Sequence, residues 1–521
     1  MKSKSLTQTT RLCAAIGLAL ASIGATSAVQ AADTTRVIIE FKPGTPAVAA
    51  ARSAIAQAGG RVQLELLRQN AVAVDLPAKA VAALQRHAGV KSVEEDARRY
   101  PMGQNAPYKA GQEVPYGIRL VQADQLPEMD KFAGNMTVCV IDSGFDNAHE
   151  DLAENSVTGD SDPGGAGDWF HDGSHHGTHV AGTIAAANNK RMGVVGVLSG
   201  KTVKLHIVKV FGDSGSWAYT STLLAATNKC EDAGAKVINM SLGGGGANTA
   251  ERDNFQRLAD AGILSVAAAG NGGNSAISYP AGYPAVMSVA GVDENKAKYT
   301  ASQFNADVEI AAPAVSVLST VPMGAGLEGN LKVVDAKYSS NPLAGSPVKQ
   351  KEARLANFGL GSAVDPLMEG KVCLIQRGTI TFGEKVKNCQ DSGGIGAVIY
   401  NNVAGNFNGT LGDVVTTIPS VSVSDTDGAA LLGQLGEKAK VTVKTSNYAK
   451  FDGTSMASPH VAGVAALVWS YFPSCTSEQI RNALNKSALD LGAAGRDNIF
   501  GYGLVQARAA YDRLLAKGCG G

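Results

Sequence analysis

The chain has 521 residues, a length that predicts two to four domains. Lys plus Arg total 46 and Asp plus Glu total 46, so the formal net charge is zero. This balance provides neither the basic surface of a nucleic-acid-binding protein nor a solvating acidic tail. Only 18% of the residues are charged and 61 are glycines, a composition typical of a tightly packed, loop-rich α/β protein.

Residues 1–31 have the pattern of a secretion signal. Basic residues precede an apolar segment at 12–23, and small residues lead to a predicted cleavage site at Val29-Gln30-Ala31. A buried N-terminal helix would show a polar face, which this segment lacks. Beyond it, no apolar run reaches the 18 or so residues that a membrane span needs. We therefore expect a secreted protein without a stable membrane anchor.

Six cysteines follow this signal and would enter an oxidising compartment, where disulfide bonds are expected. Proximity in the sequence suggests the pairs Cys373–Cys389 and Cys475–Cys519, and elimination then leaves Cys139–Cys230. Six cysteines allow 15 pairings, so other connectivities stay open. None of the cysteines has the spacing of a metal site.

Residues 33–96 alternate between strand and helix patterns in the order β-α-β-β-α-β, which is typical of a ferredoxin-like α+β unit. The predicted strands are 37–41, 62–67, 71–76 and 90–96, and the predicted helices are 47–58 and 78–87. Residues 97–111 then read as a polar linker that contains Pro and Gly. Such a linker is suited to proteolytic cleavage.

A β-branched strand at 136–141 ends at Asp142-Ser143-Gly144. A carboxylate at the carboxyl end of such a strand lies where α/β sheets bind their ligands. An aspartate that only closes an Asx turn is the alternative interpretation.

Three histidines, His175, His176 and His179, surround a Gly-Thr pair at the start of an apolar helix pattern. A zinc site is not expected, because the glutamate of a zincin motif is missing. A histidine at a helix N-terminus is instead a candidate general base, since the helix dipole favours its neutral form.

Further strands are predicted at 203–210, 236–244 and 263–271, with a helix at 220–233 between the first two. Strands and helices that alternate at this spacing predict a parallel sheet covered by helices. Asn271 ends the last of these strands, so another polar side chain is placed at the carboxyl edge of the sheet.

Ser455 lies in a small-residue turn, Gly453–His460, directly before a helical run. Pro459 belongs in the first turn of a helix, where its missing N–H costs no hydrogen bond. Ser455 is therefore at or near a helix N-terminus, a favourable place for a nucleophile whose reaction develops an oxyanion. The alternative is a serine that only caps the helix.

Four motifs together resemble the subtilisin-like serine proteases. They are Asp142-Ser143-Gly144, His176–Gly182, Ala269-Gly270-Asn271 and Gly453–His460. Their order, with the serine last, is the known order of subtilisin, whereas an α/β-hydrolase esterase would have the order Ser…Asp…His. The resemblance implies a three-layer α/β catalytic domain with a parallel sheet, made of residues 112–321 and 448–521.

The resemblance implies the chemistry residue by residue. Ser455 is the nucleophile, His176 the general base and acid, and Asp142 the residue that orients His176. Asn271 and the Ser455 backbone N–H would form the oxyanion hole. His179 and His460 would then be structural. An inactive relative that only binds partners is the alternative function.

The resemblance also implies the substrate-binding residues. Substrate would lie as a strand between Ser241-Leu242-Gly243 and a segment near Gly212–Gly215, which includes Gly215. The primary pocket would be walled by Ala268, Ala269 and Gly270, with Ser278 near its base. Because the loop at 271–279 carries no charge, we expect a broad, apolar-leaning preference.

Calcium is the cofactor that the resemblance implies, bound by oxygen ligands. The matching positions are Gln112, Asp151, Ala187, Asn189, Met192 and Val194. One residue, among Lys190-Arg191, is inserted in this loop relative to the family. A calcium-free surface loop is therefore the alternative.

Two accessory modules complete the prediction. Residues 33–96 resemble the inhibitory propeptide of the family, especially at Val93–Asp96, so the precursor would inhibit and process itself as a monomer. Residues 322–447 resemble a β-rich protease-associated (PA) domain inserted before the nucleophile. This insertion either controls access of protein substrates or is a passive stabilising element.

Overall fold

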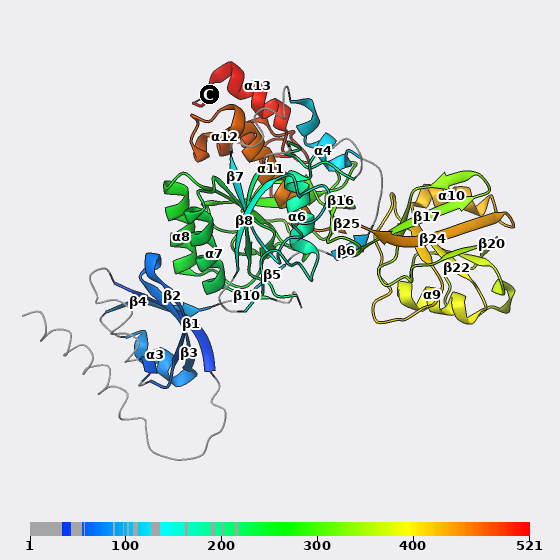
Figure 1. Ribbon diagram of the computed structural model, residues 1–521, viewed down its shortest axis with the longest axis horizontal. Coiled ribbons are helices and arrows are strands. Elements are labelled where there is room, and N and C mark those ends of the chain that lie inside the picture. The colour runs from blue at the N-terminus through cyan, green and yellow to red at the C-terminus, as the bar shows by residue number, and fades with distance from the viewer. Residues whose placement is uncertain are drawn as a thin grey trace, which may run out of the picture.

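The computed structural model describes residues 34–42, 55–56, 58–86, 89–96, 98–101, 104–107, 113–126, 136–161, 165–188, 193–200, 203–213 and 217–520. The predicted secretion signal lies outside the described residues. The chain forms an N-terminal domain (34–96), a central module (113–321 and 447–520) and an inserted domain (326–446). The N-terminal and inserted domains lie on opposite sides of the central module (Figure 1).

The N-terminal domain is an antiparallel sheet in the order β2-β3-β1-β4, covered by helix α3. Its elements are β1 Thr34–Phe41, β2 Arg61–Leu66, β3 Ala71–Pro77, α3 Ala78–Leu84 and β4 Val90–Glu95. This order is that of the predicted ferredoxin-like unit. Most of the first predicted helix, 47–58, lies outside the described residues.

Two short strands form where the sequence predicted only a linker. They are β5 Arg98–Pro101 and β6 Gln104–Pro107, and each pairs with strands of the central module. A four-residue polar stretch has no strand pattern of its own. Its hydrogen-bonding partners are distant in the sequence, so local reasoning could not find these strands.

A seven-stranded parallel sheet forms the middle of the central module, in the order β15-β14-β13-β11-β7-β9-β8. The strands are β7 Thr137–Asp142, β8 Ser156–Ser161, β9 Lys204–Lys209, β11 Val237–Met240, β13 Leu264–Ala268, β14 Val286–Val292 and β15 Val308–Pro313. Alternate residues of β7 belong to different cores, Val138 and Val140 to one, Cys139 and Ile141 to the other.

Helices cover both faces of this sheet (Figure 1). Helices α6 His176–Ala185 and α11 Thr454–Tyr471 pack in one core, and α7 Thr220–Asp232 and α8 Thr249–Asp260 in the other. The other α-helices described in the central module are α4 Tyr116–Leu120, α12 Ser477–Ser487 and α13 Ala507–Lys517. The predicted three-layer α/β fold is therefore confirmed. Among the described residues, no helix has both the length and the apolarity to cross a membrane.

The inserted domain is built on an eight-stranded sheet in the order β18-β17-β24-β20-β21-β22-β23-β19. Its elements are β17 Gly326–Val333, β18 Ala336–Tyr338, β19 Ser340–Pro342, β20 Gln350–Asn357, β21 Val372–Gln376, α9 Phe382–Asp391, β22 Gly396–Tyr400, β23 Ser420–Val423, α10 Asp425–Leu432 and β24 Lys438–Ser446. A capping box between Thr381 and Glu384 begins α9.

Two antiparallel strand pairs in succession join the inserted domain to the central module. In the central module β16 Val317–Thr320 pairs with β25 Tyr448–Asp452, and in the inserted domain β17 pairs with β24. The two pairs meet where the Val321 N–H donates to the Asn447 carbonyl at 2.9 Å. The chain therefore enters and leaves the inserted domain through neighbouring strands, and the returning strand β25 leads to Ser455.

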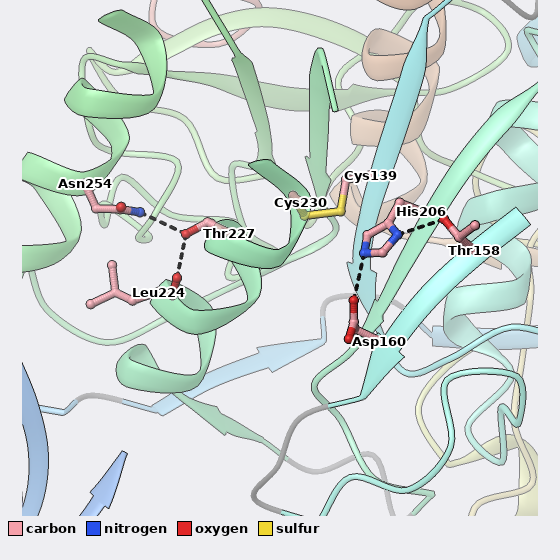
Figure 2. The surroundings of a disulfide bond; sticks show 8 residues. All are labelled: Cys139, Thr158, Asp160, His206, Leu224, Thr227, Cys230 and Asn254. Carbon is pink, nitrogen blue, oxygen red and sulfur yellow. Dashed lines mark hydrogen bonds and ion pairs between the residues drawn. A yellow bond between two sulfur atoms is a disulfide. The ribbon is translucent and has the colours of Figure 1, made fainter. Parts of the chain in front are cut away.

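All six cysteines that follow the predicted signal form disulfide bonds: Cys139–Cys230, Cys373–Cys389 and Cys475–Cys519. The predicted pairings are confirmed. Figure 2 shows that Cys139–Cys230 ties β7 to α7, beside His206 of the neighbouring strand β9. Cys139 lies three residues before Asp142 in β7, so the bond anchors the strand that carries a predicted site residue to a helix on the opposite face from α6.

Candidate active site

Asp142 is the last residue of β7, and its side chain is fully buried. Its Oδ1 atom lies 2.7 Å from Nδ1 of His176, the first residue of α6, and accepts a second hydrogen bond from the Ser143 N–H. The carboxyl end of a central strand and the start of a helix thus bring together two residues that are 34 positions apart. The Nδ1–H of His176 is directed to the carboxylate, so Nε2 is the nitrogen left for proton transfer.

A second buried aspartate, Asp172, holds this pair in place. Its Oδ1 accepts from the Ser143 hydroxyl at 2.8 Å, and its Oδ2 accepts from the N–H of Thr178 at 2.8 Å. The Ser143 hydroxyl also accepts from the N–H of Gly177 at 2.8 Å. Asp172 therefore ties the end of β7 to the first turn of α6. Sequence analysis did not select it, although it stands in the loop directly before the histidine motif.

Glycine is required where these two segments meet. A Cβ atom at Gly177 would lie 2.2 Å from the carbonyl oxygen of Gly144. Gly144 itself has φ = 118°, a value that residues with a Cβ atom rarely adopt. The His-Gly and Ser-Gly pairs in the two motifs thus allow the backbone approach that sets the distance between Asp142 and His176.

Ser455 is the second residue of α11, which begins after Gly453 with φ = 148°. No side chain caps this helix at Gly453, so the interpretation of Ser455 as a capping residue is wrong. The Ser455 hydroxyl instead donates to the carbonyl of Ser241 at 3.1 Å, and the Ser455 carbonyl accepts from the Ser241 hydroxyl at 2.7 Å. The Ser455 N–H belongs to the first turn of α11, where backbone N–H groups lack partners within the helix.

Asn271 reaches the same turn from the end of β13. Its Oδ1 atom accepts from the N–H and the hydroxyl of Thr454, at 2.9 and 3.1 Å. The Thr454 hydroxyl also accepts from the N–H of Gly270 at 3.1 Å. Because Thr454 engages the oxygen, the Nδ2 group is the part of the Asn271 amide available to a ligand. An amide donor and the start of α11 are thus held next to Ser455.

The two other motif histidines are engaged in packing. His179 Nε2 lies 2.9 Å from the Val317 carbonyl, and its ring stacks on Phe451. Burial lowers the pKa of His179 to about 3. His460 Nδ1 lies 2.7 Å from the Met456 carbonyl, and burial lowers the pKa of His460 to about 4. Both rings are neutral at pH 7 and join structural elements, whereas the ring of His176 is bonded to the buried carboxylate of Asp142.

Strand β5 occupies the cleft beside Ser455. It lies between β12 Leu242–Gly243 and β10 Ala218–Tyr219 and pairs antiparallel with both. The predicted wall Ser241-Leu242-Gly243 therefore does accept a strand. The opposite wall is at Ala218–Tyr219, so the expectation of a wall near Gly212 is corrected. Among the described residues of this segment, those that pair with β5 are in β10, and the predicted Gly215 lies outside the described residues.

Comparisons with known proteins match this geometry. The model of the Subtilase family matches residues 133–343 and 425–503, which is more than half of the chain. The chain belongs to the subtilase family. Subtilisin E of Bacillus subtilis is 35% identical over 321 residues, covering 59% of this chain and 78% of that protein. The alkaline protease of Shouchella clausii is 29% identical over 455 residues, covering 86% and 82%.

The structural comparison agrees. The psychrophilic subtilisin-like protease Apa1 from Pseudoalteromonas sp. AS-11 is 41% identical, with a TM-score of 0.68, and covers 79% of this chain and 99% of that one. The PA domain model matches residues 331–431, which confirms the nature of the inserted domain. This subtilase is thus a subtilisin-like serine peptidase with an inserted PA domain.

The predicted primary pocket of this subtilase is a buried, uncharged wall. Ala268, Ala269 and Gly270 are buried at the end of β13, and Ser278 is only 4% exposed. The loop that carries Ser278 is joined to the end of β12 by the Gly244 N–H, which donates to the Tyr279 carbonyl at 3.0 Å. The loop at the base of the predicted pocket is therefore joined by the backbone to the predicted substrate-binding segment Ser241-Leu242-Gly243.

The predicted calcium loop of the subtilase is described in part. Asp151 is fully buried, its Oδ2 accepts from the Val194 N–H at 2.8 Å, and its carbonyl accepts from the Ala187 N–H at 2.8 Å. The described residues contain no group of three or more His, Cys, Asp or Glu side chains suited to a metal. The predicted set differs from such a group, because it has one carboxylate and otherwise amide and carbonyl oxygens, which suit Ca²⁺. Three of its members lie outside the described residues: Gln112, Asn189 and Met192.

The N-terminal domain of the subtilase places two carboxylates at helix N-termini of the central module. Asp96, only 2% exposed, accepts from the Ser221 N–H at 2.6 Å in the first turn of α7 and from Arg36 Nε at 2.8 Å. Glu94 accepts from the N–H of Thr249, the first residue of α8. Negative charge at a helix N-terminus is favourable because the free N–H groups and the helix dipole face it.

The rest of this interface combines a small apolar centre with an exposed charged rim. Apolar residues of the N-terminal sheet meet α7 and α8 in one cluster: Ile38, Leu66, Ala71, Ala73, Leu224 and Ala250. At the rim, Arg68 pairs with Glu231 and Asp232 near the end of α7. The N-terminal domain is therefore docked on the two helices that flank the cleft strands β10 and β12.

Proposed function

We propose that this subtilase is a secreted serine endopeptidase made as a precursor that inhibits and processes itself. The observation that carries the proposal is strand β5, which is part of the chain itself and pairs with both walls of the cleft beside Ser455. A chain held in this way resembles a bound peptide substrate. The docked N-terminal domain continues directly into this strand, as a self-inhibiting propeptide would.

The proposed mechanism uses four groups. His176 Nε2 takes the proton of the Ser455 hydroxyl while Oγ attacks the peptide carbonyl. Asp142, bonded to Nδ1 at 2.7 Å, keeps the ring in the required tautomer and stabilises the imidazolium. The Asn271 side-chain amide and the Ser455 N–H donate hydrogen bonds that stabilise the negative charge developing on the substrate oxygen. His176 then protonates the leaving amine. In the second half of the reaction His176 takes a proton from water, the hydroxide attacks the acyl group, and His176 returns the proton to Ser455 Oγ.

The pairing of strands β5 and β6 suggests the position of the bond that is cut in the precursor. Strand β5 ends at Pro101 in the cleft, and β6 begins at Gln104 on β25, the strand that leads to Ser455. The two described strands therefore pair on either side of the nucleophile, β5 with β12 and β6 with β25. We propose that self-processing cuts one of the three bonds between Pro101 and Gln104, within the predicted linker at 97–111.

N-terminal sequencing of the secreted protein, with and without Ser455→Ala, tests the proposal. We expect the active chain to begin between residues 102 and 104 and the variant to keep its propeptide. If the Ser455→Ala variant had the same processed N-terminus as the active chain, another protease would perform the cut. Labelling of Ser455 by a serine-directed phosphonate tests the inactive-relative alternative. Replacing His176 with Ala should abolish labelling, whereas His175→Ala should retain it.

A calcium ion held by the Asp151 loop and an apolar-leaning specificity complete the proposal. Calcium would stabilise the loop between α6 and the strand pairing of Glu113 with Val194, without taking part in catalysis. We expect a chelator to lower the melting temperature of the phosphonate-inactivated enzyme and Asp151→Asn to remove this effect.

Cleavage only after Lys or Arg in a peptide library would contradict the apolar-leaning preference.

A further inference from the structure

The inserted domain is hydrogen-bonded to the strand that leads to the nucleophile. Asn408 lies in the segment between β22 and β23, and its Nδ2 atom donates to Asp452 Oδ1 at 2.7 Å. Asp452 is the last residue of β25, three positions before Ser455. Figure 1 shows β16 and β25 at the junction of the central module and the inserted domain. A side chain of the inserted domain thus contacts the point where the turn with the nucleophile begins.

The same amide group of Asn408 contacts the neighbouring strand. Its Nδ2 atom also donates to the Ser316 hydroxyl at 3.2 Å, and the Ser316 N–H donates to Asp452 Oδ1 at 2.6 Å. Ser316 directly precedes β16 and has φ = 51°, a left-handed conformation that a residue with a Cβ atom adopts at an energetic cost. The carboxylate and the amide therefore hold Ser316 in a conformation that it would not favour alone.

Asn408 is itself oriented from the inner part of the inserted domain. Asn341 of β19 is fully buried, and its Nδ2 atom donates to Asn408 Oδ1 at 2.8 Å and to the Phe407 carbonyl at 3.1 Å. Asn341 Oδ1 accepts from Lys450 Nζ of β25 at 3.3 Å. Because a carboxylate only accepts hydrogen bonds, the nitrogen of the Asn408 amide must face Asp452. Both ends of this amide are thus bonded, which fixes its orientation.

Strand β25 reaches the oxyanion amide through two residues. After Asp452, the Gly453 N–H donates to the Ala314 carbonyl at 2.8 Å, and the Thr454 N–H donates to Asn271 Oδ1 at 2.9 Å. The amide predicted to stabilise the oxyanion is therefore bonded to the second residue after Asp452. A displacement of the end of β25 would move this amide relative to Ser455.

Strand β16 reaches the helix that carries the general base. The Thr320 hydroxyl donates to the Thr178 carbonyl at 2.8 Å, and the Ser319 hydroxyl donates to the His179 carbonyl at 2.8 Å. Both carbonyls belong to the first turn of α6, which begins with His176. The junction held by Asn408 is thus connected to each part of the proposed catalytic machinery.

We propose that Asn408 is a positioning residue of the enzyme, through which the inserted domain sets the geometry of Ser455 and the oxyanion amide. Asn408 acts through Asp452 and Ser316, at the junction of β16 and β25, and not by contact with the reacting atoms. The proposal rests on the proposed protease function. It gives the inserted domain a part in catalysis, in addition to control of substrate access or passive stabilisation.

The charge of Asp452 governs the strength of this link. Burial raises the pKa of Asp452 to about 6, although the Ser316 and Asn408 donors and the Lys450 charge act in the opposite direction. Above this pH both donors bond to a negative charge, and hydrogen bonds to a charged group are roughly twice as strong as neutral ones. The link therefore weakens as the pH falls through about 6. Removal of the Asn408 donor should raise the pH at which Asp452 gains its proton.

A cavity of about 210 Å³, lined by Ser316 and Lys450, lies beside this link between the two domains. The sequences of β16, β6 and residues 404–409 contain no titratable side chain. The titratable groups that face Asp452 or Lys450 from the other elements are Glu113, Tyr116, Asp293, Glu294 and Tyr299. The test variants leave all of these groups in place, so a shifted pH profile reports on the contact between Asn408 and Asp452.

The test compares variants of the secreted, active enzyme on a short chromogenic peptide amide. Asn408→Ala removes the donor to Asp452. We expect kcat at pH 8 to fall about tenfold, with KM changed less than about twofold, because the lost bond acts on the geometry of the transition state. The midpoint of the acid limb of kcat should move upward by about one pH unit. Asn408→Asp keeps the shape of the side chain and the bond from Asn341, but it opposes two carboxylates and should cause a larger shift.

Two further variants are the controls. Asn406 lines the same cavity, but its amide donates to the Ser339 carbonyl at 3.3 Å within the inserted domain. Asn406→Ala should therefore keep both kcat and the pH profile. Asp452→Asn keeps an acceptor for Ser316 and Asn408 and does not titrate. Addition of Asn408→Ala to Asp452→Asn should then leave the acid limb where Asp452→Asn alone places it.

Two results would overturn the inference. One is a loss of kcat in Asn408→Ala that is equal at every pH, with an unmoved acid limb, because this indicates a merely structural role. The other is a kcat and a pH profile that match those of the parent enzyme. If Asn408→Ala does not fold, the pH profile of Asn408→Asp decides in its place. Absence of both peptide cleavage and phosphonate labelling of Ser455 in the parent enzyme would instead contradict the proposed protease function.

Discussion

The N-terminal domain and the inserted domain both pack on the central module, but their interfaces differ in kind. The N-terminal domain docks through carboxylates at two helix starts, a small apolar patch and exposed ion pairs such as Arg68 with Glu231. The inserted domain is continuous with the central module through β16–β17 and β24–β25. Its contact with β25 is a network of amide side chains that includes the fully buried Asn341.

This difference is consistent with the proposed release of the N-terminal domain after processing and with retention of the inserted domain. The N-terminal domain is joined to the central module by a single chain segment, which includes β5 and β6, and residues 33–111 contain no cysteine. The inserted domain is joined twice and is stapled internally by Cys373–Cys389. Charged contacts on a surface lose little when the partner is released into water, whereas buried amides lose their partners.

The largest effect we expect is acid unfolding of the module that both domains share. His179 and His460 are buried and neutral, with pKa values lowered by burial to about 3 and about 4, whereas an unfolded histidine titrates near 6.5. The unfolded state therefore binds more protons below pH 6.5, and stability falls as the pH decreases toward the folded values. The loss is about 3 kcal/mol for each residue at pH 4.

Urea titrations of the phosphonate-inactivated enzyme between pH 7 and pH 4 measure this slope. The slope reports the difference in the number of bound protons between the unfolded and folded states, and His460→Gln should lower this difference by about one proton. A slope that stays the same in this variant would show that other groups govern the acid transition. The N-terminal domain, if added as a separate peptide, should dissociate before or with this transition and not protect against it.

Removal of the Cys139–Cys230 bond should destabilise the platform on which the N-terminal domain docks. The bond closes a separation of 91 residues and ties β7 to α7, whose first turn binds Asp96. The double change to Ala should lower the free energy of unfolding by about 2–5 kcal/mol and weaken binding of the N-terminal domain. The matched control is loss of Cys373–Cys389 in the inserted domain, which should leave that binding unchanged. Equal effects of both changes on binding would remove the distinction between the two interfaces.

Asp96→Ala should weaken inhibition by the N-terminal domain, supplied in trans as a peptide of residues 33–101. The carboxylate accepts from the Ser221 N–H and from Arg36, and hydrogen bonds to charged groups contribute about 1.5–3 kcal/mol. The inhibition constant should therefore rise by about 10–150-fold. Glu95→Ala is the control, because Glu95 is exposed beside it. A comparable rise in the control would mean that general charge, and not the helix start, holds the domain.

Arg68→Ala should have the smallest effect. Arg68 is paired with Glu231 and Asp232, but its side chain is 39% exposed, and such pairs contribute about 0–1 kcal/mol. We expect a change in the inhibition constant below about fivefold, and less at high salt. A change as large as that of Asp96→Ala would make the charged rim, and not the helix starts, the basis of release.

The sequence predicted features that have a local pattern or a motif. β-branched runs, small residues and Pro459 predict the strand ends at Asp142 and Asn271 and the helix start at Ser455, and these residues lie at one edge of the sheet. The disulfide pairs followed from proximity and elimination. The 7-stranded order, by contrast, depends on how helices pack between strands, which periodicity alone does not determine.

Features that depend on contacts between distant segments could not be predicted. The wall at Ala218–Tyr219, the strands β5 and β6 and the Asn408–Asp452 bond each exist only because a partner far away in the sequence supplies hydrogen bonds. Asp172 stood beside the histidine motif, but an aspartate before a helix is more often only a turn residue. Its role follows from its burial and its hydrogen bonds to Ser143 and Thr178, which depend on the folded structure.

The insertion between β16 and β25 also sets an order for folding. These strands pair Val317 with Phe451 across more than one hundred residues, and closing so long a loop carries a large entropic cost in an unfolded chain. Once the inserted domain has folded, β17 and β24 already hold the two ends together, so this pairing becomes local. We therefore expect the β16–β25 pair, which leads to Ser455, to form after the inserted domain has folded, so the position of the nucleophile depends on the folding of the insertion.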